Sequence, residues 1–152
     1  MKSDPTIVLH VSIVSPVDLG RIQRELYSID SHFQARDISV DNRVRTSAEL
    51  DNLIKSSGVD LSSKQQRQTL IQQLQFVRRT APTVRMIFSK QPGNRELSML
   101  VKWFREFGHP NTLIEAGVDP SIGGGCIVKT STKKFDFSYA RLLSEKHLTL
   151  SV

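Results

Sequence analysis

Residues 118–128 read Val-Asp-Pro-Ser-Ile-Gly-Gly-Gly-Cys-Ile-Val, so three consecutive glycines join two apolar segments. Asp119-Pro120 is expected to end the incoming strand, because proline fixes its φ angle and has no amide hydrogen to donate to a sheet. The glycines permit backbone angles that other residues avoid. We therefore predict two strands, Ile114–Val118 and Cys126–Thr130. Five residues form the structural bend between them: Asp119, Pro120, Gly123, Gly124 and Gly125.

Glycine-rich loops also occur in phosphate-binding sites, where the loop leads into a helix whose N-terminus faces the anion. Here a strand pattern follows Gly125, and no Lys-Ser or Lys-Thr pair lies at the offset of a nucleotide-binding loop. We therefore interpret the bend as structural, and we predict no cofactor.

The composition is that of a soluble globular protein, with 152 residues, 38% hydrophobic and 24% charged. The net charge of +6 suits an acidic partner, a nucleic acid or an anionic membrane, but the basic residues are spread along the chain, which equally fits an ordinary surface. The single cysteine, Cys126, excludes an internal disulfide and makes a cysteine-built metal site implausible. No apolar segment approaches the roughly 20 residues that span a bilayer, and the N-terminus lacks a secretory pattern, so we expect a cytoplasmic location.

The first 45 residues are predicted to form a β-α-β unit. Apolar residues alternate along Thr6–Val14, which is typical of a strand. Ser15 is placed to cap a helix that runs to about Gln34, because apolar residues follow it at three- and four-residue spacing. A short second strand is predicted at Ile38–Val40.

Residues 46–81 are predicted to be a helical connector. Thr46–Glu49 has the form of a capping box, with threonine at the cap and glutamate three residues later, and Gly58 ends the helix that it opens. Ser62 begins a second helix, which Pro82 ends.

Residues 82–152 are predicted to form a β-α-β-β-α domain. The pattern gives a strand at Thr83–Ser89, a helix from near Asn94, the strand before the bend, a hairpin whose second arm is Lys134–Phe137, and a closing helix capped by Ser138. The predicted fold class is therefore α+β, in three segments: 1–45, 46–81 and 82–152.

The helix that begins near Asn94 carries two apolar stripes. Its core face is Leu97, Leu100, Val101 and Phe104. Met99, Trp103 and Phe107 follow at i, i+4 and i+8 and form a second stripe, displaced around the axis. This second stripe is either a deeper core under further helices or a docking surface for a partner helix, since large apolar residues serve in both places.

No catalytic or metal-binding residue is predicted. His10 and His109 are the histidines to consider as catalysts, but neither has a neighbouring carboxylate or nucleophile in a recognisable motif. Asp119 and Asp136 are the acids of the motif region, and an aspartate before proline is more often a turn former.

The second half of the chain, roughly Ser62 to Leu148, resembles the C-terminal domain of the F-type ATP synthase delta subunit, the homologue of the mitochondrial oligomycin-sensitivity-conferring protein. That family has a strand, an amphipathic helix, a strand ending in Val-Asp-Pro-Ser-Leu-Ile-Gly-Gly, a hairpin with Asp-x-Ser, and a Leu-rich helix. The matching residues are Val118, Asp119, Pro120, Ser121, Ile122, Gly123, Gly124, Asp136, Ser138, Leu142 and Leu143. This chain differs by one apolar residue fewer before the glycines, by the extra Gly125, and by a predicted β-α-β opening where family members usually begin with a helical bundle.

The resemblance implies a non-catalytic connector in the peripheral stalk, which links the stalk helices to the catalytic head during proton-driven ATP synthesis. It implies b-type stalk subunits and the alpha subunits of the head as partners, and no nucleic acid. The implied location is the cytoplasm, peripheral to the inner (plasma) membrane, with membrane contact only through the complex. Met99, Trp103 and Phe107 are then the candidate anchors for stalk helices, and the terminal helix is the next choice.

Three alternatives remain. A nucleic-acid-binding α/β domain would place aromatics on an open sheet face; Phe135 and Phe137 share one strand face, but no RNP-like run is present. An archaeal or vacuolar-type ATPase stalk subunit would also end in a glycine-joined α/β domain, but its long charged N-terminal helix is missing here. A small enzyme is the third alternative, without an assembled triad, metal set or nucleotide motif.

Overall fold

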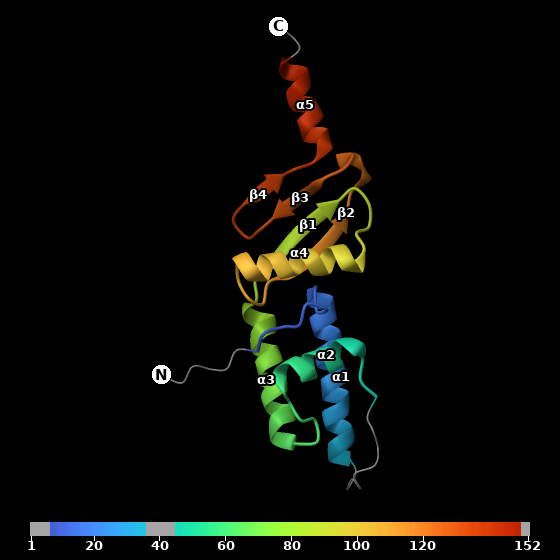
Figure 1. The fold of residues 1–152 in the computed structure, drawn as a ribbon, viewed down its shortest axis with the longest axis vertical. Coiled ribbons are helices and arrows are strands. Elements are labelled where there is room, and N and C mark those ends of the chain that lie inside the picture. Colours follow the sequence, from blue (N-terminus) through green and yellow to red (C-terminus); the bar gives the residue numbers. More distant parts are fainter. Residues whose placement is uncertain (1–6, 36–44, 150–152) are drawn as a thin grey trace, which may run out of the picture. The chain divides into compact units, whose positions relative to one another are not determined.

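The structure, a computed structural model, describes residues 7–35 and 45–149, and the side chains as far as residue 145. This part of the chain contains five α-helices, a short helical turn and a four-stranded sheet, so the fold class is α+β, as predicted. The chain divides into two compact units, Met1–Ala81 (unit 1) and Pro82–Val152 (unit 2). The predicted segments 1–45 and 46–81 therefore fall in one unit (Figure 1).

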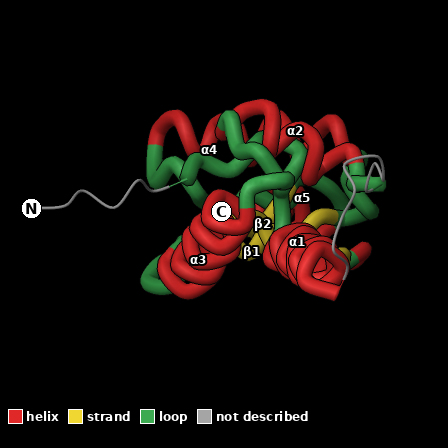
Figure 2. The backbone as a smooth tube through the Cα atoms, turned by 90° about the horizontal axis from the view of Figure 1, so that it is seen from below, coloured by secondary structure: helices red, strands yellow, loops and turns green. Residues whose placement is uncertain are grey.

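Unit 1 consists, in its described residues, of three helices: α1 (Pro16–Ala35), α2 (Ala48–Ser57) and α3 (Lys64–Thr80). Helices α1 and α3 pack against each other, as Figures 1 and 2 show. Apolar residues at three- and four-residue spacing are almost completely buried: Leu19, Ile22, Leu26, Ile29, Leu50, Leu53, Leu70, Leu74 and Val77. Because burying one large aliphatic side chain stabilises a fold by about 1.5–3 kcal/mol, this core is the main stabilising feature of unit 1.

A buried ion pair also joins α1 to α3. Arg67 Nε donates a hydrogen bond to Asp30 Oδ1 at 2.9 Å, and the Arg67 side chain is only 3% exposed. The same guanidinium donates to the Leu61 carbonyl at 2.8 Å and lies 4.3 Å from the centre of the Phe33 ring. The loop before α3 is thus tied to both helices.

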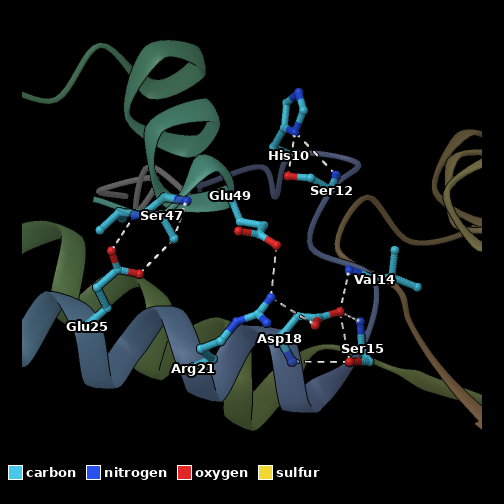
Figure 3. Close-up of polar contacts among 10 residues, drawn as sticks. His10, Ser12, Val14, Ser15, Asp18, Arg21, Glu25, Ser47 and Glu49 are labelled. Atoms are coloured by element: carbon cyan, nitrogen blue, oxygen red, sulfur yellow. Dashed lines mark hydrogen bonds and ion pairs between the residues drawn. The ribbon is translucent and has the colours of Figure 1, made fainter. Parts of the chain in front are cut away.

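The helix starts of unit 1 depend on capping side chains (Figure 3). At α1, the Asp18 amide donates to Ser15 Oγ at 3.1 Å and the Ser15 amide donates to Asp18 Oδ2 at 3.0 Å, so the predicted cap at Ser15 is confirmed. At α2, the cap is Ser47 rather than the predicted Thr46. The reason is Glu25 of α1, which accepts hydrogen bonds from the Ser47 amide and hydroxyl at 2.6 and 2.7 Å.

The next cap is displaced in the same way. Helix α3 begins after Ser63, whose Oγ accepts from the Gln66 amide, and not at the predicted Ser62. The Ser62 amide and hydroxyl instead donate to Asp60 Oδ1 at 2.9 and 2.7 Å. The predicted end of α2 at Gly58 is confirmed, because this residue adopts the left-handed conformation with φ of 68°.

The strand predicted at Thr6–Val14 is wrong for the residues that the structure describes, 7–14, which form an irregular segment. A turn interrupts it, where the Ile13 amide donates to the His10 carbonyl at 3.0 Å. Of the alternating apolar side chains, Ile7, Leu9 and Ile13 are nevertheless buried, as is the neighbouring Val14, whereas Val11 in the turn is exposed. The alternation therefore reflects a loop that covers a core. The second predicted strand, Ile38–Val40, lies outside the described residues.

Unit 2 is built on a sheet of four strands: β1 (Thr83–Phe88), β2 (Leu113–Val118), β3 (Cys126–Lys129) and β4 (Lys134–Asp136). Their order is β2-β1-β3-β4; β1 and β2 are parallel, and the other pairs are antiparallel. Helix α4 (Asn94–Phe107) connects the parallel pair, the turn η1 (Pro120–Ile122) precedes β3, and α5 (Tyr139–Thr149) closes the chain. The sheet has one strand more than the formula β-α-β-β-α, because both hairpin arms join it.

Strand register assigns the side chains of the sheet to two faces. The apolar face carries Val84, Met86, Phe88, Ile114, Val128 and Phe135. The charged face carries Arg85, Ile87, Glu115, Ile127, Lys129, Lys134 and Asp136. Helix α4 lies over the lower ends of β1 and β2 in Figure 1, and it covers the apolar face there, where Val84, Met86 and Ile114 are buried together with Val101 of the helix.

Candidate functional site

The two stripes of α4 differ in exposure. Val101 of the core face is fully buried, and Leu97, Leu100 and Phe104 are half-buried. The other stripe, here called the α4 stripe, is exposed: Met99 by 65%, Trp103 by 55% and Phe107 by 71%. Of the two interpretations that the sequence leaves open, this exposure favours a docking surface over a deeper core. Single exposed apolar residues are normal, but three in register on one helix are typical of interaction sites.

The direction of the α4 stripe follows from a contact on the other side of the helix. Arg105 Nε donates a hydrogen bond to the carbonyl of Thr112, which directly precedes the edge strand β2, at 3.0 Å. Burial lowers the pKa of Arg105 to about 10, so the guanidinium stays charged at neutral pH. Arg105 lies two residues after Trp103 and thus about 200° around the helix. The α4 stripe therefore lies on the opposite side of the helix from the contact with Thr112.

Aromatic packing holds the centre of the α4 stripe in place. The Trp103 ring meets the half-buried Phe104 ring edge-on, with centroids 5.1 Å apart, and lies 5.5 Å from Phe107. Such ring pairs contribute about 0.5–1.5 kcal/mol beyond their buried area. The indole is thus anchored to the core through Phe104, and little side-chain freedom remains to be lost when a partner binds.

The sheet adds exposed aromatic residues. Phe135 lies on β4, the edge strand farthest from β2, and its side chain belongs to the apolar face. It is 44% exposed. Its ring stacks on that of Phe137, with centroids 6.3 Å apart and planes 7° apart, and Phe137 is 59% exposed. The α4 stripe, Phe135 and Phe137 together are called the apolar shelf below. Phe135 and Phe137 were not predicted as partner anchors, because their position relative to α4 depends on strand register.

The predicted bend at 119–125 has a well-defined local geometry. Asp119 Oδ1 accepts hydrogen bonds from the amide and the hydroxyl of Ser121 at 3.0 and 2.6 Å, and these bonds hold the pKa of Asp119 below its ordinary value. Asp136 and Ser138 form the same kind of pair, with the Ser138 amide 3.0 Å from Asp136 Oδ1, and this pair lowers the pKa of Asp136. The two aspartates of the motif region thus shape turns.

The glycines are explained by close approach of the β4–α5 junction. A Cβ atom on Gly124 would lie 2.5 Å from the Tyr139 ring, and one on Gly125 would overlap the carbonyl oxygen of Phe137. The Tyr139 amide donates to the Gly124 carbonyl at 3.1 Å, and the Phe137 amide donates to the Cys126 carbonyl at 2.9 Å. The bend therefore fixes the base of α5. Because β3 follows it, the arrangement of a phosphate-binding loop is not formed.

The histidines considered as catalysts make local contacts. His10 Nδ1 lies 2.9 Å from the Ser12 hydroxyl, and His109 Nδ1 accepts from the Asn111 amide at 3.1 Å. Among the described residues, no cluster of three His, Cys, Asp or Glu side chains is placed to hold a metal ion. A hollow of about 460 Å³ in unit 1 is lined by glutamine, serine, threonine and aliphatic side chains, none of which titrates. No helix in the described part of the chain is long and apolar enough to cross a bilayer.

Comparison with known proteins adds no identity to this geometry. No protein-family model matches the sequence, and no curated protein matches it. The function is therefore inferred from the apolar shelf, the bend and the sequence motif.

Proposed function

We propose that the chain is a non-catalytic connector, which binds an amphipathic helix of a partner protein on the apolar shelf. The observation that carries this proposal is the exposure of Met99, Trp103 and Phe107 along one side of α4. Helix-in-groove recognition uses apolar anchors at this spacing. From Met99 to Phe107 the stripe rises about 12 Å, or roughly two turns, enough for two or three anchors of a partner helix.

We further propose that the partner belongs to the peripheral stalk of an F-type ATP synthase. The motif residues resemble those of the delta subunit, and in this chain they form the bend that positions the β4–α5 junction next to the sheet. Unit 1 supports the same proposal. Family members usually begin with a bundle of helices, and the regular elements among the described residues of unit 1 are three helices.

In this proposal the two units have different partners. The apolar shelf of unit 2 binds the b-type stalk helices, and the helices of unit 1 bind the alpha subunits of the catalytic head. The chain thereby prevents the head from turning with the rotor, and it transforms no substrate. Its position is peripheral to the membrane, which it reaches only through the complex.

One observation favours the nucleic-acid alternative, namely the exposed parallel rings of Phe135 and Phe137. Proteins that bind single strands combine such rings with a basic groove on the same surface. Here the basic side chains of the sheet, Arg85, Lys129 and Lys134, belong to the opposite face from Phe135. The rings and the charges therefore do not form one binding surface, and the partner helix is the better proposal.

The test is the affinity of Trp103→Ala for the C-terminal helical segment of a b-type stalk subunit. Full burial of the exposed 55% of a Trp side chain removes about 140 Å², worth about 3 kcal/mol, so affinity should fall by roughly 100-fold. Phe76→Ala is the matched control, because Phe76 is a 43% exposed aromatic residue on α3. It should bind as the unchanged chain does. Unchanged affinity of a folded Trp103→Ala variant would contradict the proposal.

A further inference from the structure

The charged face of the sheet carries a row of three cations across neighbouring strands. Arg85 of β1 stands opposite Lys129 of β3, and Lys129 stands opposite Lys134 of β4. Adjacent strands lie about 4.8 Å apart, so the three charges follow one another across the sheet. Like charges placed directly opposite each other destabilise a sheet. This row is called the cation row below. It lowers the stability of the sheet, and the fold itself gives no reason for it.

Glu115 and Asp136 share the face with the cation row, but neither forms an ion pair with it. Glu115 stands opposite Arg85 on β2, but among the described residues no carboxylate lies within ion-pairing distance of Arg85, Lys129 or Lys134. Lys134 acts on Asp136 only as a minor cause of its lowered pKa, after the hydrogen bonds from Ser138. Arg85 and Lys134 are exposed and Lys129 is half-buried. The row is thus open to an external anion.

A second row on the same face is aliphatic. Ile87 stands opposite Ile127, both are half-buried, and Gly117 on the other side of Ile87 adds no side chain. Asp136 stands opposite Ile127 at the β4 edge of this row, where its carboxylate accepts a hydrogen bond from the Ser138 amide. The paired positions of this face hold no aromatic residue, so the face offers no platform on which nucleic-acid bases stack. Aliphatic and cationic side chains thus run side by side across the strands.

We propose that the charged face docks an acidic amphipathic helix of a partner protein. Its carboxylates pair with Arg85, Lys129 and Lys134, and its apolar residues lie on Ile87 and Ile127. Carboxylates three or four residues apart on a helix are about 5–6 Å from each other, close to the strand spacing, so successive acids meet successive cations. This surface is on the opposite face of the sheet from the apolar shelf and does not depend on the stalk proposal.

The experiment uses the full chain and a synthetic helical peptide with leucines on one face and glutamates beside them. A second peptide with lysines in place of the glutamates is the control ligand. Lys129→Glu should weaken binding of the acidic peptide by at least about tenfold, since it reverses the central charge of the row. Lys90→Glu, at an exposed lysine outside the strands, and Trp103→Ala should each change the affinity by less than about twofold.

Lys129→Gln distinguishes binding from a structural role. It should raise the melting temperature of unit 2 by relieving the repulsion within the cation row. It should also lower the affinity for the acidic peptide. The proposal is overturned if the acidic peptide does not bind, or if Lys129→Glu binds it unchanged. Loss of binding in Trp103→Ala alone would place the peptide on the apolar shelf and overturn it too. The proposal is also overturned if a single-stranded oligonucleotide or phosphatidylglycerol vesicles bind more tightly than the acidic peptide and this binding depends on Lys129.

Discussion

Three glycines of this chain share nearly the same backbone conformation but differ in the space around them, which allows strain and steric overlap to be separated. Gly58, Gly123 and Gly125 have φ angles of 68°, 72° and 71°. A Cβ atom on Gly58 would have no neighbour within 4 Å, and one on Gly123 would lie 4.0 Å from its nearest neighbour. On Gly125 it would overlap the Phe137 carbonyl oxygen and lie 3.3 Å from the Ser138 Cα.

Substitution by alanine should therefore cost different amounts at the three sites. The left-handed conformation alone costs about 1–2 kcal/mol for a residue with a Cβ atom, and this is the full expected cost for Gly58→Ala and Gly123→Ala. Gly125→Ala must in addition displace the Phe137 backbone. That displacement weakens the hydrogen bond to Cys126, worth about 1 kcal/mol, and disturbs the Ser138 cap, worth about another 1 kcal/mol. The expected total is about 3–4 kcal/mol.

The assay is guanidinium unfolding of the full chain, followed by the fluorescence of Trp103, the single tryptophan, which lies in unit 2. Gly123→Ala and Gly125→Ala change the same unit, so their midpoints are directly comparable. The difference of about 2 kcal/mol corresponds to roughly 10 °C in melting temperature for a domain of this size. Equal destabilisation by the two substitutions would refute the steric explanation of the triple glycine.

Two further predictions concern charged groups. Arg67→Leu should destabilise unit 1 by about 3–5 kcal/mol, because it leaves the Asp30 carboxylate buried without its partner, whereas adding Asp30→Leu should recover much of the loss in thermal unfolding. Ser138→Ala should raise the pKa of Asp136 toward its ordinary value, as measured by carboxyl ¹³C shifts during titration. Because the folded-state pKa is lowered, this contribution to stability is present above the unfolded-state pKa and is lost as pH falls through the folded value. A single Arg67 substitution that costs nothing, or an unmoved pKa of Asp136, would contradict these expectations.

The sequence predicts the elements of unit 2 well because each depends on local signals. Proline and glycine positions delimit β1, β2 and the bend, and helical spacing identifies α4 with both of its stripes. What it does not predict is which surface stays open. That depends on the face of the sheet that α4 covers, which Arg105 and its hydrogen bond to the Thr112 carbonyl help to fix.

The errors in unit 1 have a common cause, namely contacts between residues distant in sequence. The alternation along residues 7–14 is that of a strand, but most of its apolar side chains are buried in a loop. Thr46 has the capping-box spacing with Glu49, whereas Glu25 on another helix selects Ser47. Likewise, the cation row and the place of Phe135 on the apolar face require the strand register, which no single segment contains.

The central claim is that the apolar shelf binds a partner helix, and the emission of Trp103 tests it most directly. The indole is 55% exposed, and it is the chain's one tryptophan. Titration with a tryptophan-free b-type stalk segment should shift the emission to shorter wavelength and shield it from acrylamide, because the partner removes the ring from water. Binding detected by calorimetry with no change in emission or quenching would contradict the claim.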